Sequence, residues 1–288
     1  MADRRDRIRR RKVLAAREPF FKIDLKGLIR LGIIAGVIVA GVLIIANAVA
    51  QSNVAGSYMA KAETIKIGVR ADVKGFGEVG ENGTVQGFDV DVAREVVLRV
   101  FGKDKPVAFV ALSSEDAGAG IKYGEIDIAA GFLAAKTERV QGYILTDPYY
   151  TDKVYAVSAS AGIANSFADL DEKNVGILSS MLSVSQATDW LRDKKVTAQI
   201  AKYYGLDDAK MDLDKNKINA FLAPQALIKQ YLGNYIIVGE ALGTVGYSIM
   251  LPSSQGAVQG AMSGAIHAMQ SDGTMQNLAV KWGISYSK

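Results

Sequence analysis

The hydrophobic pattern in the middle of the chain alternates between strand and helix periodicity. Residues 64–69 alternate apolar and polar side chains, as in a half-buried strand, and residues 89–101 repeat apolar residues at helical spacing. Residues 107–112 predict a strand, residues 113–123 a helix, and residues 126–131 a buried strand. This order predicts a parallel-rich sheet with helices on its faces.

The same succession returns later in the chain and predicts a second α/β unit. The expected strands are 174–179, 196–201, 218–223, 235–239 and 247–251, and the expected helices are 183–193, 206–215, 224–232 and most of 253–283. Two such units predict an α/β fold of two lobes with a cleft between them, where ligands sit beyond the carboxyl ends of strands. We expect residues 63–155 and 248–288 to form lobe 1 and residues 156–247 to form lobe 2.

The N-terminal part has a different pattern. Residues 31–50 are almost continuously apolar, and a helix of that length spans about 30 Å, the thickness of a bilayer core. Residues 1–30 carry eleven basic and four acidic side chains, so the positive-inside rule places them in the cytoplasm. We therefore expect a basic tail (1–30), a transmembrane helix (31–50), a linker (51–62) and an extracytoplasmic body, periplasmic or on the cell surface.

A cleaved signal peptide is the alternative interpretation of this segment. Ala48-Val49-Ala50 and Ala60-Lys61-Ala62 both have the small-x-small form of a cleavage site. The long basic region before the apolar run favours the uncleaved anchor. Both alternatives deliver the body across the cytoplasmic membrane.

Charge and cysteine content remove several classes of function. The basic residues are concentrated in the N-terminal tail, so the rest of the chain has no positive excess to neutralise nucleic-acid phosphates. The chain has no cysteine, which excludes disulfides, cysteine-ligated metals and a lipid-modified cysteine anchor. The only histidine, His267, is predicted to lie in a C-terminal helix away from the cleft. We expect no enzyme activity, no metal and no cofactor.

Several short motifs in one register resemble a known family. They are Ile65–Asp72, Gly83–Ala93, Gly124–Asp127, Thr137–Arg139, Thr146–Tyr150 and the ending Ser271–Thr274 with Lys281–Gly283. Their order is similar to the type 2 periplasmic-binding fold, in particular the polar-amino-acid-binding family (family 3) of extracellular solute-binding proteins, with the aspartate/glutamate binders as the nearest type. The resemblance implies two lobes joined by crossing strands, near 153–158 and 245–251, that close on a ligand.

The resemblance also implies which residues contact the ligand. Arg139 matches the family arginine that pairs with the ligand carboxylate, a geometry that suits the guanidinium fork. Arg70 occupies a position where acidic-amino-acid binders carry a basic residue. Lys136 stands where the family commonly has a threonine and is a candidate third cation. Ser179, Ser180 and Ser183 are candidate hydroxyl donors from the second lobe. Phe76 and Phe132 are candidate walls of the pocket, although both also fit an ordinary core.

The chain departs from the family where the ligand ammonium would bind. The acid expected after the strand at 218–223 is replaced by Pro224, and an expected hydroxyl is replaced by Ala134. Because an unpaired buried ammonium is costly, an amino acid held in the family's usual way is disfavoured. Three readings stay open: an anion or carboxylate without an amine, an amino acid in a shifted pose, or no ligand.

The function expected from the sequence is a membrane-anchored solute-binding protein that delivers an amino-acid-like or small carboxylate ligand to an ABC-type permease. The alternative is a non-transporting accessory or scaffold subunit of an envelope membrane complex, with a degenerate cleft.

Overall fold

The structure, a computed structural model, describes residues 33–42, 52–112, 116–131, 142–160 and 163–286. The chain divides into two compact units, residues 1–51 and residues 52–288. In the first unit, residues 33–42 form a helix. No helix within the described ranges is both long and apolar enough to cross a membrane.

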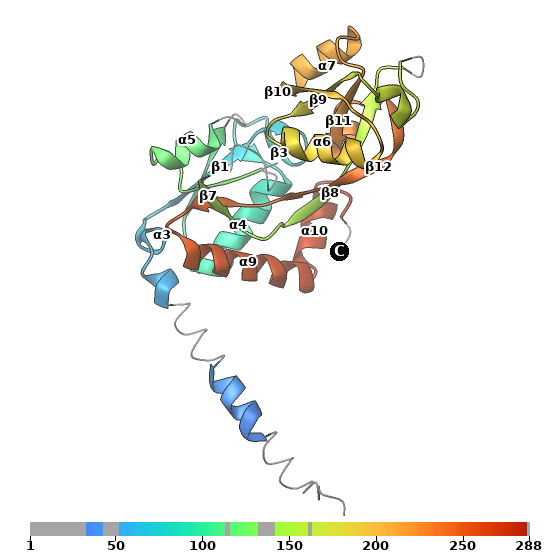
Figure 1. Cartoon of the computed structure of the whole chain (residues 1–288). Helices are drawn as coiled ribbons and strands as arrows, with labels where there is room; N and C mark the ends of the chain where they lie inside the picture. Colours follow the sequence, from blue (N-terminus) through green and yellow to red (C-terminus); the bar gives the residue numbers. More distant parts are fainter. Residues whose placement is uncertain (1–32, 43–51, 113–115, 132–141, 161–162, 287–288) are drawn as a thin grey trace, which may run out of the picture. The chain divides into compact units, whose positions relative to one another are not determined.

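Lobe 1 is built on a sheet with the strand order β5-β1-β6-β13-β7. Strand β1 runs parallel to β5 on one side and to β6 on the other, while β13 is antiparallel to β6 and β7. Helices α4, α9 and α10 pack on one another, and α5 packs on β1, β6 and β13 (Figure 1). The elements are β1 (Ile65–Arg70), α4 (Phe88–Phe101), β5 (Val107–Leu112), α5 (Ala117–Lys122), β6 (Ile128–Ala130), β7 (Tyr143–Leu145), β13 (Met250–Pro252), α9 (Gly256–Ser271) and α10 (Thr274–Lys281).

The start of helix α4 explains the Gly87-Phe88-Asp89 motif. Gly87 precedes the helix with a φ of 139°, a conformation that L side chains rarely adopt. A Cβ at this position would lie 2.2 Å from the Phe76 carbonyl oxygen. The helix then buries Phe88, Val92 and Val96 on one face, at the spacing that predicted it. A small sheet of β2 (Asp72–Val73), β3 (Gly77–Val79) and β4 (Val85–Gln86) fills the connection between β1 and α4.

Lobe 2 is built on a second sheet, with the strand order β10-β9-β11-β8-β12. Strand β9 is parallel to β10 and β11, and β8 is antiparallel to β11 and β12. Its elements are β8 (Tyr150–Ser158), the short 3-10 helix η2 (Phe167–Leu170), β9 (Asn174–Leu178), α6 (Val184–Asp193), β10 (Gln199–Tyr203), α7 (Leu206–Asp214), β11 (Ala220–Pro224), α8 (Gln225–Tyr231) and β12 (Ile236–Tyr247). The predicted α/β order is confirmed in both lobes.

The chain passes from lobe 1 to lobe 2 between β7 and β8, and returns between β12 and β13 (Figure 1). Tyr150 and Tyr247 pair directly where the two crossing strands enter the second sheet, and their rings stack 5.7 Å apart. Strand β12 extends well beyond the strand expected at 235–239, and the strand expected at 247–251 corresponds mainly to β13. Its register shifts between Val238 and Gly243, and the Gly243 backbone lies against the ring of Trp190 from α6. The bulge breaks the alternation from which strands are predicted.

Residues 52–61, expected to belong to a linker, are largely helical. Residues 52–55 are helical, and helix α3 (Tyr58–Lys61) begins after Ser57, whose side chain accepts a hydrogen bond from Ala60 N–H at 3.2 Å. Met59 is fully buried, and the Lys105 ammonium donates to the Ala60 and Ala62 carbonyls. Burial of one such side chain contributes about 1.5–3 kcal/mol, so this segment is part of the folded body.

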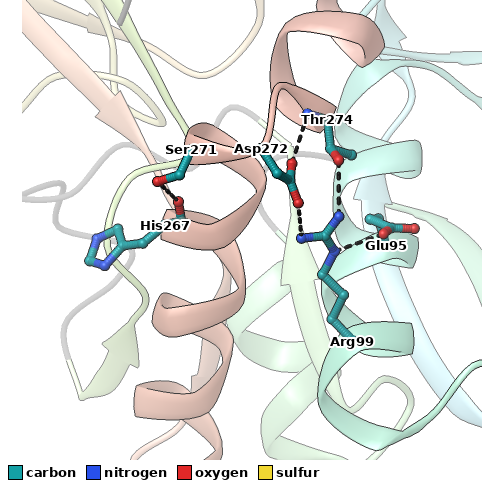
Figure 2. Close-up of polar contacts among 6 residues, drawn as sticks. All are labelled: Glu95, Arg99, His267, Ser271, Asp272 and Thr274. Atoms are coloured by element: carbon teal, nitrogen blue, oxygen red, sulfur yellow. Dashed lines mark hydrogen bonds and ion pairs between the residues drawn. The ribbon is translucent and has the colours of Figure 1, made fainter.

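The C-terminal motifs tie the last two helices to α4. Arg99 donates to Glu95 at 2.8 Å, to Asp272 at 2.7 Å and to Thr274 at 2.9 Å, as Figure 2 shows. Further along, the Trp282 indole donates to Asp91 at 2.7 Å. The motif residues at 271–274 and 281–283 thus hold the turn between α9 and α10, and the end of α10, against the first lobe.

Candidate functional site

Arg70 lies at the junction of the two lobes. It is the last residue of β1, the strand between β5 and β6, and only 6% of its surface is exposed. Its guanidinium Nη1 donates to Ser180 Oγ at 3.1 Å, which links the carboxyl end of β1 to the segment after β9 in lobe 2. A buried guanidinium needs such polar partners because desolvation of an unpaired charge is costly. The contact places a cation where the lobes meet.

The predicted serines have different local roles. Ser179 and Ser180 are buried directly after β9, and Ser179 N–H donates to the Tyr203 carbonyl at 2.9 Å. Ser183 is the N-cap of α6, and its hydroxyl accepts the Gln186 N–H at 3.1 Å. Capping of a helix N-terminus accounts for Ser183 without a ligand. Among the three, Ser180 is the one whose side chain meets Arg70.

A buried acid lies close to this junction. Asp89, in the first turn of α4, is 1% exposed and accepts a hydrogen bond from the Tyr149 hydroxyl at 2.7 Å. Burial, followed by the Asp89 charge, raises the pKa of the Tyr149 phenol well above its usual value. A Cβ at Gly131 would lie 3.0 Å from Arg70 N and 3.4 Å from Asp89 Oδ2, and Gly131 has a φ of 100°. The position therefore requires glycine.

Phe76 is both a core residue and the wall of a cavity. It is 1% exposed, packs edge-on against Tyr150 with ring centroids 5.3 Å apart, and borders a cavity of about 300 Å³. We name this space the hinge cavity. It is lined by Phe76, Tyr150, Thr151, Asp152, Lys153, Gln225, Ala226, Lys229, Gln230, Gly283, Ile284, Ser285 and Tyr286.

The lobes also touch beside this cavity. Lys74 N–H donates to the Tyr231 hydroxyl at 3.1 Å, and the Gln230 amide donates to the Lys74 carbonyl. Both partners belong to α8 in lobe 2, whereas Lys74 lies in the connection after β2. The two lobes are therefore closed on each other both at Arg70 and along α8.

Three predicted ligand residues fall outside the described part of the chain. They are Phe132, Lys136 and Arg139, together with the nearby Ala134. The expectations for them rest on the sequence resemblance alone. Pro224, the residue found where an acid was expected, is buried at the end of β11 and precedes helix α8.

Sequence reasoning missed Asp152 and Lys229. Asp152 is 6% exposed in β8, and its carboxylate accepts the Lys153 and Ala226 N–H groups, both at 2.9 Å. Burial raises the pKa of Asp152, an effect that these N–H groups and the nearby Lys229 charge oppose. The signal was an aspartate inside a strand otherwise rich in buried residues. Within the described ranges, no three His, Cys, Asp or Glu side chains gather as metal ligands would.

Comparisons with known proteins agree with this architecture. The histidine-binding periplasmic protein of Salmonella typhimurium is 26% identical over 246 residues, covering 81% of this chain and 93% of that protein. The ABC transporter arginine-binding protein 1 of Escherichia coli is 23% identical over 229 residues, covering 77% and 91%. A solved ABC uptake substrate-binding protein from Streptococcus pneumoniae with bound histidine superposes with a TM-score of 0.64, at 19% identity over 79% of this chain and 95% of that one. This last likeness shows a shared fold.

The family match covers most of the chain. The family of bacterial extracellular solute-binding proteins, family 3, matches residues 65–285, which include both sheets, both crossing strands and the Arg70–Ser180 contact. The matched residues also contain the sequence motifs from Ile65–Asp72 to Lys281–Gly283 that resemble this family. The chain belongs to the bacterial extracellular solute-binding proteins, family 3.

Proposed function

We propose that this chain is a membrane-anchored extracytoplasmic binding protein that presents an amino-acid-like or small carboxylate solute to an ABC-type importer. The observation that carries the proposal is the buried guanidinium of Arg70 between the lobes, 3.1 Å from Ser180. A guanidinium at a closing interface suits a planar anion, because it can donate two parallel hydrogen bonds to one carboxylate.

The chemistry of the junction favours a carboxylate as the group recognised there. Arg70 supplies one cation, and the resemblance supplies Arg139 and Lys136 as further cations. Ser179 and Ser180 supply hydroxyls, and Phe76 and Phe132 supply apolar walls. Pro224, by contrast, has no acceptor side chain for an ammonium. An acidic or otherwise carboxylate-rich ligand therefore fits this junction better than the basic amino acids named for several relatives.

The relatives support the wider ligand class. Two relatives are named as binders of histidine and arginine, and a third, from Bacillus subtilis, is named as an ABC transporter glutamine-binding protein. All three are named for polar amino acids. We extend this class to the present chain and propose no catalytic step for it.

The membrane anchor is part of the proposal. Residues 33–42 form a helix whose apolar side chains are more than half exposed, including Ile33, Val37 and Val42. Such a surface is apolar all round, as in a lipid-facing helix. With residues 31–50 as the span and the basic tail before it, both lobes lie outside the cytoplasmic membrane.

A second function is favoured by one specific observation. The Arg70–Ser180 hydrogen bond joins one lobe directly to the other, a contact that a docking subunit with a degenerate cleft would also use to keep its lobes together. In that case the lobes would form a fixed surface for an envelope membrane complex.

Calorimetric titration of the full chain in mild detergent separates the two functions. Amino acids and small dicarboxylates are the probes, and a carboxylate ligand should give binding heat in the titration and raise the midpoint in a separate thermal unfolding scan. Substitution Arg70→Met should weaken this binding about tenfold or more. Arg94→Met is the matched control, because Arg94 is exposed on α4 with its guanidinium 4.7 Å from the Phe109 ring centroid. Absence of binding to every probe would favour the docking subunit.

A further inference from the structure

The hinge cavity is chemically distinct from the Arg70 junction. Its volume of about 300 Å³ lies at the lower end of the range of small-molecule pockets. Neither Arg70 nor any of the predicted serines lines it. Its walls come instead from β8, helix α8, Phe76 and residues 283–286. A ligand in this cavity would therefore meet different side chains from a ligand held by Arg70.

One wall of the hinge cavity carries a buried carboxylate. Asp152 is held in place by the N–H groups of Lys153 and Ala226, each 2.9 Å away, so its position is set by backbone. Each of its two oxygens accepts one of these bonds, and a carboxylate has about four lone-pair sites in all. Asp152 therefore keeps acceptor capacity toward the cavity, where a cation would be desolvated and strongly attracted.

Aromatic rings stand beside this carboxylate. The Tyr150 ring centroid lies 5.3 Å from that of Phe76 and 6.4 Å from that of Tyr286, and all three residues line the hinge cavity. Aromatic faces attract ammonium groups through the ring quadrupole, especially where water is excluded. An organic ammonium in the hinge cavity would therefore meet both the Asp152 carboxylate and aromatic side chains.

A cation from α8 also lines the cavity. The Lys229 ammonium donates to Ser285 Oγ at 3.1 Å, and its charge acts on Asp152. The cavity thus presents a negative group and a positive group to the same small volume. A ligand that carries only an ammonium or only a carboxylate would satisfy one of the two.

We propose that the hinge cavity is a second binding site, for a small zwitterion whose ammonium meets Asp152 and the aromatic rings while its carboxylate meets Lys229. The site is separate from the Arg70 junction, so it stands whether or not that junction binds a solute. Its size suits a molecule such as glycine betaine or proline.

Binding in this cavity is coupled to lobe closure. Phe76 belongs to lobe 1, whereas Lys229 belongs to α8 of lobe 2, and the Lys74 contacts to Tyr231 and Gln230 run beside them. A ligand that touches both walls binds the closed arrangement better than an open one. By linkage, such a ligand shifts the equilibrium between the open and closed arrangements of the two lobes toward the closed one.

Calorimetric titration of the full chain in mild detergent tests the site. The probes are glycine betaine, proline and glycine, with choline and 3,3-dimethylbutanoate as matched molecules that each lack one charge of glycine betaine. A zwitterion should bind, and both single-charge probes should bind more weakly. Asp152→Asn and Lys229→Gln should each weaken zwitterion binding about ten- to a hundredfold. Asp193→Asn and Lys173→Gln are controls, since both residues are exposed and lie outside the cavity lining.

The variants also separate this site from the Arg70 junction. Arg70→Met should leave zwitterion binding intact while it weakens carboxylate binding. The proposal is overturned if no zwitterion binds the wild-type chain, or if binding is unchanged in both Asp152→Asn and Lys229→Gln. It is also overturned if Arg70→Met alone removes zwitterion binding, because the ligand then occupies the junction. Lys229 is on the surface of α8, so Lys229→Gln remains a test if Asp152→Asn fails to fold.

Discussion

The two places where the lobes meet differ in how much space lies beside their charged groups. At the junction, Arg70 and Ser180 close on each other and leave the cation buried. In the hinge cavity, Asp152 and Lys229 border about 300 Å³ of space. A ligand at the junction has to fit beside the Arg70–Ser180 contact, whereas a ligand in the cavity enters space that already exists. Equal affinities at the two places would therefore require stronger ligand contacts at the junction.

The largest expected effect comes from removal of the satisfied contact. Ser180→Ala takes away a hydrogen bond to a buried guanidinium and should lower the free energy of unfolding by about 1.5 kcal/mol. Urea unfolding measures this. The matched control is Ser248→Ala, since Ser248 is fully buried and its hydroxyl has no hydrogen-bond partner among the described residues. Ser248→Ala should be neutral or slightly stabilising. If both variants lose the same free energy of unfolding, the Arg70–Ser180 contact contributes nothing to stability.

A smaller change in stability is expected from filling the open space. Ala226→Leu places extra methyl groups at the half-buried cavity lining, where open space can take them up, and should change the free energy of unfolding by less than about 1 kcal/mol. It should nevertheless abolish zwitterion binding and spare carboxylate binding, measured by calorimetry. Ala257→Leu, at an exposed position of α9, is the control for the added side chain. Retained zwitterion binding in Ala226→Leu would place that ligand elsewhere.

The smallest effect is expected away from both places, in the network of Figure 2. Hydrogen bonds from the Thr274 side chain and N–H, followed by Arg99, lower the pKa of Asp272 from 3.8 to about 2. Because the folded-state pKa is depressed, the stabilisation is present above the unfolded pKa of 3.8 and is lost as the pH falls through about 2. Asp272→Asn should therefore be less stable than wild type near pH 5 and approach it near pH 2.

Urea midpoints measured across that pH range test the sign of this effect. Asp193→Asn, whose carboxylate has no ion pair among the described residues, serves as the control and should show no such convergence. Ligand binding at the junction and in the cavity should not respond to Asp272→Asn. A response there would mean that the α9–α10 turn is coupled to lobe closure.

The sequence predicted the elements whose signals are local. Strand β1 follows from the alternation of apolar and polar residues, and helix α4 follows from apolar residues at helical spacing. The need for Gly87 before α4 is clear only from the structure, because a Cβ there would clash with the Phe76 carbonyl oxygen. Only the first part of strand β12 was predicted, at 235–239, because the bulge between Val238 and Gly243 interrupts the pattern. The helical residues before β1 were missed because small and polar residues dominate there. Pairing with Lys105, which is distant in sequence, holds that segment in place.

The candidate site was less predictable than the fold. Arg70 could be singled out because it ends a strand in a recognisable motif, whereas its partner Ser180 could only be one of three candidates. Asp152 gave little signal, because its burial depends on the approach of Ala226 from α8. The hinge cavity could not be predicted at all, since its walls come from four separate segments whose distances are set by tertiary packing.

The two tryptophans of the chain give each lobe its own optical reporter. Trp190 lies on α6 against the bulge of β12, and Trp282 follows α10 with its indole donating to Asp91. Replacement of either by phenylalanine leaves a single emitter in one half of the body. Fluorescence during chemical denaturation would then follow the melting of each half separately, without any added label.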